Sequence, residues 1–321
     1  MLTINQIFDL AIKMAVKADP RGEKGIKEYL NAVGKEYEDA KPKDKRFFDS
    51  EKLTNPYADS RVHLDDGKTA VKRVLVGIDI DGAEIILASQ LNERGKKIDL
   101  VMAHHPLGRG LADLHSVMDM QVEIFLKAGV PVHVAEKVMA ERIKEVGRGL
   151  HPINHSKIID LARLLGINLL NVHTPTDNLV YKYLNDFLIK KKVRIIRDVI
   201  DALLELPEYE AAARLGAGPK IFSGDPGHKV GRYILEMTGG TNPSEKVYKE
   251  LSRYGISTTV GMHMKEPARE LASKHHMNVV IAGHMASDSL GMNLFLDELE
   301  KRGVEIVPCG GLIRVSRVKQ R

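Results

Sequence analysis

The sequence predicts an α/β protein with two lobes built around mixed, largely parallel sheets. From position 74 onward, short apolar runs alternate with longer amphipathic segments, a pattern typical of β-α-β units. The length of 321 residues exceeds the common size of a single domain. A hydrophobic fraction of 43% supplies enough apolar side chains for a sizeable core in each lobe.

The first part of the chain is expected to be helical and then extended. Apolar residues recur at helical spacing over positions 3–17, and positions 23–40 offer a second, more polar helix. Lysines, acidic residues and turn formers over 41–67 predict a connection with little regular structure. We therefore assign residues 1–180 to an N-terminal lobe with a helical start and a charged insertion at about 18–70.

The β-α-β part of the chain divides into two halves around a helical middle section, expected from about 178 to 213. A C-terminal lobe is accordingly assigned to residues 181–321 and begins with this helical connection. Strands are expected at 74–80, 99–103, 130–135, 168–172, 233–238, 255–260, 278–282 and 304–307. Helices are expected at 82–94, 116–128, 154–165, 244–254, 266–275 and 289–302.

Composition argues against several functional classes. The net charge of +5 is mild, and the basic clusters at 190–197 and 314–321 carry no interleaved aromatic residues, so nucleic-acid binding is not expected. No apolar run reaches membrane-spanning length, and no basic leader precedes the first apolar residues. A single cysteine excludes an internal disulfide and fits a reducing compartment. We therefore expect a cytoplasmic protein without a membrane partner.

Two adjacent histidines, His104 and His105, end one of the expected buried strands. In open α/β sheets, ligands collect outside the carboxyl ends of the strands. Adjacent residues on an extended chain point in roughly opposite directions, so a single ion could not easily accept both imidazoles. The pair therefore suits two metal ions, or one ion and one supporting contact.

The same arrangement recurs at two further strand ends. His173 is followed four residues later by Asp177, and His284 is followed at the same spacing by Asp288. Residues four apart share one face of a helix. Imidazole and carboxylate without thiolate favour zinc, manganese, iron, cobalt or nickel. The remaining histidines lack such a pattern and are expected to be structural or solvated: His63, His115, His133, His151, His155, His228, His263, His275 and His276.

Three motifs occur in a fixed order, HHPL at 104–107, HTxxD at 173–177 and GHxxxD at 283–288, after the segment VLVGIDID. In these motifs the chain resembles the GTP cyclohydrolase I type 2 family, also called the Nif-three-like family. The similarity extends over about 74–177 and 233–317. It implies two α/β lobes with a metal cleft between them, and a homo-oligomer in the form of a ring-shaped hexamer.

The resemblance also implies two divalent metal ions as cofactors, with Asp288 in the bridging position. The ligands that it implies are His104, His105, Asp177, His284 and Asp288. His173 is expected to orient Asp177 or to donate to the substrate. The chain departs from the family pattern in three respects: Asp288 stands where glutamate is usual, the family's tryptophan is missing, and residues 178–232 match no family element.

The expected function is that of a metal-dependent hydrolase acting on a small molecule, a nucleotide or a related heterocycle, with opening of the GTP purine ring as the family-implied example. Two divalent ions lower the pKa of a coordinated water and polarise a carbonyl or phosphoryl oxygen. His173 is the candidate catalytic residue for proton transfer. Asn242 is expected to cap a helix whose amides could bind phosphate.

Two alternative functions stand beside the hydrolase. A metal-binding regulatory or interaction protein without turnover fits the same ligand set. A dehydrogenase is disfavoured, because no expected strand is followed by the G-x-G-x-x-G turn that binds a dinucleotide.

Overall fold

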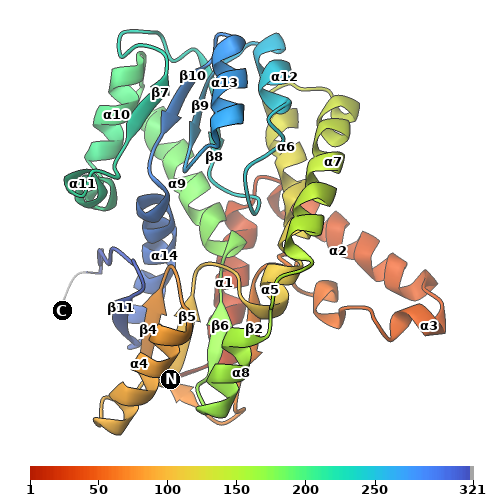
Figure 1. Cartoon of the computed structure of the whole chain (residues 1–321), viewed down its shortest axis with the longest axis vertical. Helices are drawn as coiled ribbons and strands as arrows, with labels where there is room; N and C mark the ends of the chain where they lie inside the picture. The colour runs from red at the N-terminus through yellow and green to blue at the C-terminus, as the bar shows by residue number, and fades with distance from the viewer. Residues whose placement is uncertain (319–321) are drawn as a thin grey trace.

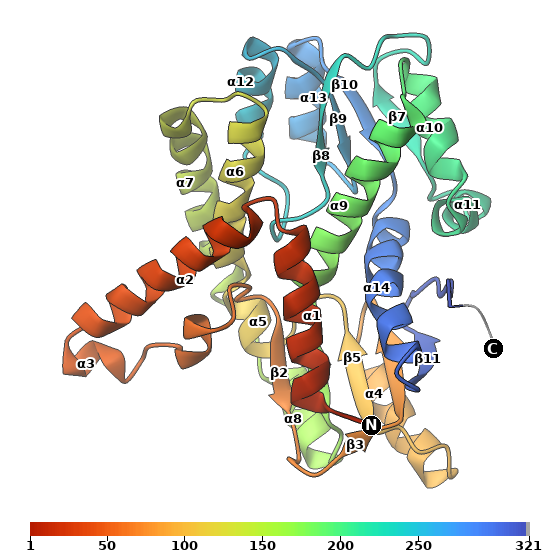
Figure 2. The ribbon, with the colours of Figure 1, turned by 180° about the vertical axis from the view of Figure 1, so that it is seen from behind.

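The computed structural model describes residues 1–318 and contains two main sheets that are joined by two long helices (Figures 1 and 2). Both sheets are mixed and largely parallel, and helices cover them, so the predicted α/β class is confirmed. The long helices α9 (Thr174–Lys191) and α14 (His284–Glu300) run side by side through the middle of the molecule.

The first sheet has five strands in the order β11-β4-β5-β6-β2. The first four are parallel, and β2 pairs antiparallel with β6. Strand β5 is buried along its whole length, as expected for a strand covered on both faces. The strands are β2 (Arg61–Leu64), β4 (Arg73–Gly77), β5 (Leu100–Ala103), β6 (Leu169–Asn171) and β11 (Glu305–Cys309).

Helices pack on both faces of this sheet. One face contacts α1 (Ile4–Ala18) and α14, while the other contacts α4 (Gly82–Glu93) and α8 (Lys157–Leu164). Short elements complete the lobe: β1 (Leu2–Thr3) pairs with β3 (Ala70–Val71), and α5 (Gly108–Ala112) leads into the 3-10 helix η2 (Leu114–Asp119).

The second sheet has four strands in the order β7-β10-β9-β8, of which β7 is antiparallel to its neighbour. One face packs on α9, α10 and α11, and the other on α6, α7, α12 and α13. The strands are β7 (Lys220–Ser223), β8 (Arg232–Glu236), β9 (Ile256–Gly261) and β10 (Asn278–Ile281). The helices are α6 (Met120–Lys127), α7 (Val132–Leu150), α10 (Ile196–Leu204), α11 (Pro207–Arg214), α12 (Val247–Arg253) and α13 (Glu266–Lys274).

Helices α9 and α14 approach each other closely at Gly291. A Cβ atom at this position would collide with the carbonyl oxygen of Thr176, so a larger residue would push the helices apart. Both helices start beside the centre of the molecule, and α14 is buried over most of its length. The close crossing therefore fixes the distance between the first turns of the two helices.

The last strand of the chain corrects the expected lobe boundaries. Strand β11 was assigned with the C-terminal lobe at 181–321, but it pairs in parallel with β4 in the first sheet. The reason is that α14 starts near the second sheet and packs onto the first, so the chain returns to the N-terminal lobe. The chain thus reaches the second sheet a first time with α6 and α7, returns to the first sheet at β6, crosses again through α9 and comes back through α14.

The expected strand at 130–135 is wrong, because helix α7 starts at Val132. Valines at alternate positions suggested a strand, but Ala135 and Met139 are four residues apart and both are buried in the core. Pro131 precedes the helix as its N-cap residue.

Helix α2 (Gly22–Asp39) corresponds to the helix expected at 23–40 and projects from the body of the molecule (Figure 2). The stretch 41–67 contains more regular structure than its composition predicts: α3 (Pro42–Lys45), η1 (Ser50–Leu53) and strand β2. Arg61 on β2 is buried and forms ion pairs with Asp49 and Glu51. Charges that looked solvated in the sequence are therefore paired with one another inside the fold.

Within residues 1–318, no helix combines the length and the apolar character that crossing a membrane requires.

Candidate metal centre

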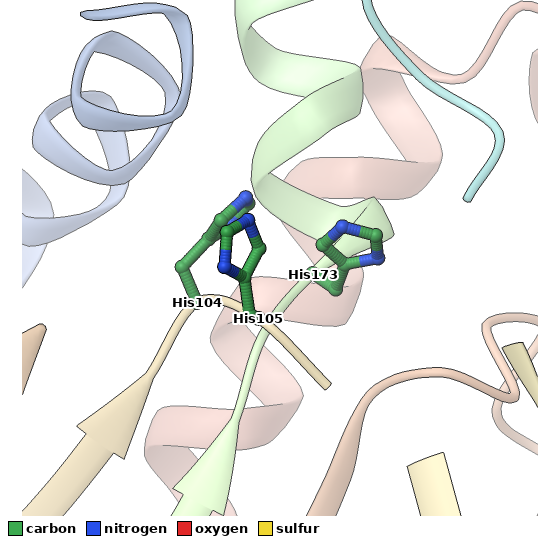
Figure 3. Close-up of side chains that lie close together, drawn as sticks. All are labelled: His104, His105 and His173. Carbon is green, nitrogen blue, oxygen red and sulfur yellow. The ribbon is translucent and has the colours of Figure 1, made fainter. Parts of the chain in front are cut away.

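The two adjacent histidines lie at the carboxyl end of β5. The backbone N–H groups of His104 and His105 donate to the carbonyl oxygens of Gly77 and Ile78, at 2.9 and 3.0 Å, which extends the pairing with β4 beyond the strand. Figure 3 shows both imidazoles close to that of His173, which follows β6. The ring centroids of His104 and His173 are 5.0 Å apart.

His104 is buried, with 1% of its surface exposed, and its ring orientation is fixed by hydrogen bonds. Its Nδ1 lies 3.2 Å from the carbonyl oxygen of Val172, which can only accept, so Nδ1 carries the proton. The Nε2 lone pair therefore faces the centre, and it has no hydrogen-bond partner in the described chain. Burial lowers the pKa of His104, which favours the neutral form that binds metals.

Two carboxylates reach the same point from the first turns of α9 and α14. Asp177 and Asp288 are 4% and 0% exposed. An Oδ1 atom of each carboxylate lies close to His104 Nε2, at 3.5 and 3.6 Å respectively. Asp177 Oδ1 and both oxygens of Asp288 lack hydrogen-bond partners among residues 1–318. Buried, unpartnered oxygens of this kind are satisfied by a cation, a proton or a bound water molecule.

His105 and His284 complete the group on the other side of Asp288. Their Nε2 atoms lie 3.4 and 3.3 Å from Asp288 Oδ2. His105 Nδ1 is held by Asp79 Oδ1 at 2.7 Å, a contact that directs Nε2 toward the centre. His284 follows Gly283, whose φ of 116° and closeness to the carbonyl of Ala217 leave no room for a Cβ atom.

The spacing of these atoms fits shared cations. Ligand atoms 2.0 to 2.2 Å from a tetrahedral ion lie about 3.3 to 3.6 Å from one another. The nitrogen-to-oxygen distances around Asp288 and His104 cover the range 3.3 to 3.6 Å, too long for good hydrogen bonds. Three overlapping groups of His and Asp residues could each hold a metal ion: His104, His105 and His173; His105, His284 and Asp288; and His104, Asp177 and Asp288.

The charges of the centre are unbalanced without a cation. Burial raises the pKa of Asp177, and the charge of Asp288 adds to this shift. Burial also disfavours ionisation of Asp288, but the surrounding imidazoles, His104 foremost, outweigh it and hold the pKa of Asp288 below its usual range. The pKa values of these two neighbouring carboxylates are therefore shifted in opposite directions, and divalent cations bound beside them would favour the ionised form of both.

His173 lies within the centre rather than at its margin. Its Nδ1 is 2.7 Å from Asp59 Oδ2, and its Nε2 is 3.7 Å from Asp177 Oδ2. Burial would lower the pKa of His173, but Asp177 and then Asp59 raise it to about 9. The geometry therefore places His173 Nε2 among the possible ligand atoms as well as in a position to hold a proton.

All six residues singled out from the sequence thus lie together: His104, His105, His173, Asp177, His284 and Asp288. Three other residues of the site were missed. Asp79 and His263 follow the ends of β4 and β9, so the strand-end argument could have found them. Asp59 carried no signal, because it lies in the charged insertion and approaches His173 only through the fold.

His263 was expected to be structural or solvated, yet it lies beside His284 with ring centroids 4.5 Å apart. Its Nδ1 contacts Asn242 Oδ1 at 2.8 Å, and Asn242 Nδ2 donates to the carbonyl oxygen of His263 at 3.0 Å. This corrects the expected role of Asn242 as a helix cap, because α12 begins only at Val247. The segment around 240 turns toward the centre, and its asparagine side chain holds His263 in place.

A small cavity of about 50 Å³ adjoins the centre. It is lined by His173, Asp177, His284 and Asp288 on one side, and by α6 and the carboxyl ends of β8 and β9 on the other. A wider hollow of about 400 Å³ opens from the same histidines and is flanked by Arg142 and Lys265. The centre is therefore accessible to a small molecule.

The chain is similar to the crystal structure of a NIF3 superfamily protein from Sphaerobacter thermophilus, with a TM-score of 0.75 and 28% identity over 97% of this chain and 99% of that one. Reduced HcgD from Methanocaldococcus jannaschii matches with a TM-score of 0.51 and 14% identity, over 83% and 94% of the two chains, a similarity of fold alone.

A scan against protein-family models and a search of curated proteins give no match. The match to the Sphaerobacter protein extends over almost the full length of both chains and includes the sheets that carry the three histidine motifs. The resemblance predicted from those motifs is therefore confirmed: over nearly its full length the chain is similar to a NIF3 superfamily protein.

Proposed function

We propose that this protein is a metal-dependent hydrolase that acts on a nucleotide or a related heterocycle. In this proposal two divalent ions are held by His104, His105, Asp177, His284 and Asp288. The observation that supports it is the convergence of buried, unpartnered nitrogen and oxygen atoms from three strand ends beside an accessible cavity. Divalent ions bound there would supply Lewis-acid polarisation of the substrate and would acidify a water molecule.

The chain's own residues have separate tasks in this reaction. The protonated Nδ1 of His104 leaves Nε2 as a lone-pair donor, and Asp79 orients His105 in the same way. Asp59 holds His173 so that its Nε2 faces the cavity side of Asp177, where it can give a proton to a leaving group. Burial of both carboxylates excludes bulk water and strengthens every charge interaction in the site.

Metal content tests the first half of the proposal. The protein is purified without added metal and analysed for bound ions, together with His104→Ala and Asp288→Ala. His151→Ala is the matched control, because His151 is exposed at the end of α7. We expect both site variants to lose metal and the control to retain it. Equal metal content in all four proteins would refute the proposed ligand set.

Turnover tests the second half and separates the hydrolase from a metal-binding protein without activity. GTP and a panel of other nucleotides are incubated with the metal-loaded protein, with and without a chelator. We expect hydrolysis that stops on chelation and returns when metal is restored. Stable metal content without turnover of any nucleotide in the panel would favour the regulatory or interaction role.

A further inference from the structure

Strand β8 forms one edge of the four-stranded sheet. Its neighbour on one side is β9, and no strand of residues 1–318 pairs with its other side. Along this free side lies a groove of about 390 Å³, to which Tyr233, Ile234 and Leu235 contribute. The lining of the groove includes none of the histidines and aspartates of the metal centre, so the groove is a separate feature of the molecule.

The backbone of two β8 residues points toward the free side. The N–H group of Met262 in the segment after β9 donates to the carbonyl oxygen of Glu236, at 3.3 Å, so the backbone groups of Glu236 face β9. The N–H and C=O of one strand residue point the same way, and successive residues alternate. Those of Ile234 therefore also face β9, whereas those of Tyr233 and Leu235 face away from it. Within residues 1–318, no hydrogen bond uses these outward N–H and C=O groups.

Strand β8 lacks the devices that usually protect a sheet edge. Proline, a bulge in the middle of the strand or a charged side chain over the edge would discourage pairing. The strand contains no proline, and the irregularity in its pairing lies at its start, between Arg232 and Tyr233. The guanidinium of Arg232 is committed to the carbonyl oxygens of Tyr254 and Ala128, both at 2.9 Å. The outward backbone groups are therefore available to another strand.

The groove has an apolar wall on each side of β8, which runs between α9 and α6 (Figures 1 and 2). Helix α9 supplies Tyr181 to the lining, and α6 supplies Ile124. Tyr233 packs into the same core as α9, and Ile234 packs into the core that contains α6. Side chains of an added strand would alternate between the same two walls. An occupant therefore needs apolar residues at alternate positions.

The charged side chains of the groove leave a positive balance. Lys17 is exposed, and Lys127 has only a backbone carbonyl oxygen as a partner. Neither lysine forms an ion pair with a carboxylate among residues 1–318. The other charged side chains of the lining already have partners: Lys182 pairs with Asp186, and Asp19 pairs with Arg21. Acidic side chains of an occupant would therefore meet two uncompensated ammonium groups.

We propose that β8 pairs with an extended segment of a partner protein in which acidic residues alternate with apolar ones. The segment adds a fifth strand to the sheet and exchanges backbone hydrogen bonds with Tyr233 and Leu235. Its acidic side chains lie near Lys17 and Lys127. In strand addition of this kind, main-chain hydrogen bonds give the affinity, and pockets for alternate side chains give the selectivity. The inference goes beyond the proposed hydrolase and does not depend on it.

Synthetic peptides test the proposal on the full chain. The probes are fluorescent hexapeptides in which glutamate alternates with valine, isoleucine, leucine, phenylalanine or tyrosine, and binding is followed by fluorescence anisotropy. One control set carries lysine in place of glutamate, and another carries N-methyl groups on the apolar residues, which removes their N–H donors. We expect at least one acidic peptide to bind roughly tenfold or more tightly than both of its controls. No binding of any acidic peptide, or equal binding of the N-methylated form, would overturn the proposal.

Hydrogen exchange of the backbone amides locates the bound peptide. The best acidic peptide should slow exchange at Tyr233 and Leu235, because their N–H groups gain partners. Exchange at Ile234 and Glu236 should change little, since these amides are already paired with β9. Protection confined to other parts of the chain would show that the peptide binds elsewhere and would overturn the assignment. Neither measurement requires bound metal or nucleotide turnover.

Two pairs of variants complete the test. Tyr233→Pro removes one outward N–H group and leaves the bonds to β9 in place, and Tyr233→Phe is the matched control that keeps this group. We expect proline to lower peptide affinity roughly tenfold and phenylalanine to change it less than about twofold. Lys17→Glu should weaken binding of the acidic peptide, whereas Lys97→Glu, at an exposed position of the first lobe, should not.

The comparison of peptides on the unaltered protein does not depend on the folding of any variant. The oligomeric state of the peptide-free protein, measured by light scattering, identifies a different occupant of the edge. A change of that state in Tyr233→Pro but not in Tyr233→Phe would assign the β8 edge to a contact between copies of this chain and would overturn the proposal.

Discussion

In both sheets the carboxyl ends of the parallel strands face the centre of the molecule. The side chains that the two sheets place there differ in kind. The edge of the five-stranded sheet supplies His104, His105 and His173, whose nitrogens face carboxylates in a buried, charge-dense cluster. The edge of the four-stranded sheet supplies Glu236 and Thr238, which line a cavity with apolar walls.

In both sheets functional side chains collect at the carboxyl ends of the parallel strands, but the two sheet edges differ in the chemistry of those side chains. On the first edge the unsatisfied atoms are imidazole and carboxylate lone pairs close enough to share a cation. On the second side the buried acceptor without a partner is Gln121 Oε1 of α6, beside a cavity of about 50 Å³. The helix α14 links the two, since His284 begins it next to the cavity and Asp288 reaches the cluster one turn later.

The largest effect on metal binding is expected from a change in the His and Asp cluster at the edge of the five-stranded sheet. Replacing Asp288 with alanine removes the carboxylate that lies near His104, His105 and His284. We expect loss of nearly all bound metal and of any hydrolysis. Elemental analysis and a nucleotide turnover assay on the same sample check both expectations. A metal content equal to that of the unaltered protein would contradict the assignment of Asp288 as a ligand.

The next effect concerns the stability of chelator-treated protein. In the folded protein the pKa of His173 is about 9, above its ordinary value of 6.5. The contribution of His173 to the free energy of unfolding is therefore fully present below pH 6.5 and is lost as the pH rises through 9. We expect unfolding free energy to fall by up to about 1.4 kcal/mol per pH unit in this window. Asp59→Asn should cost about 3 kcal/mol at pH 6 and flatten the slope.

Denaturant titrations of the unaltered protein and of this variant at pH 6, 7.5 and 9 measure the effect. Asp186→Asn is the control, because Asp186 forms an exposed pair with Lys182. A slope that is the same with and without the Asp59 carboxylate would mean that this partner does not hold the proton on His173.

The close crossing of α9 and α14 sets the distance between Asp177 and Asp288, and a substitution at Gly291 tests its importance. Gly291→Ala would force the helices apart at Thr176, between Asp177 and Asp288. We expect destabilisation of about 1 to 3 kcal/mol together with weaker metal binding. Gly34→Ala in α2, where no atom lies within 4 Å of the new Cβ, should instead stabilise by up to about 1 kcal/mol. Thermal unfolding with and without metal distinguishes these outcomes.

The smallest effect is expected at His263, on the border between the edges. His263→Leu removes the imidazole that packs on His284 and pairs with Asn242. We expect metal content to be unchanged and the KM for a hydrolysed nucleotide to rise about tenfold, the value of one hydrogen bond. His151→Leu serves as the exposed control. A loss of metal from His263→Leu would instead show that this histidine contributes to metal binding.

The sequence alone determined the α/β class, the strand-end positions of the histidines and the family resemblance. These features are local: a buried strand is a short apolar run, and the residue after it lies at the sheet edge whatever the rest of the chain does. The pairing of His284 with Asp288 needed only the geometry of one helical turn.

Only the tertiary structure decided how these pieces combine. Asp59 reaches His173 from 114 positions away, and Gln121 reaches Gly239 from 118, contacts that no local pattern encodes. Strand β11 returns to the first sheet for the same reason, since partner choice among parallel strands depends on where the connecting helix packs. Which buried lone pairs remain unsatisfied is a property of the assembled interior, because a side chain's hydrogen-bond partners exist only once the chain has folded.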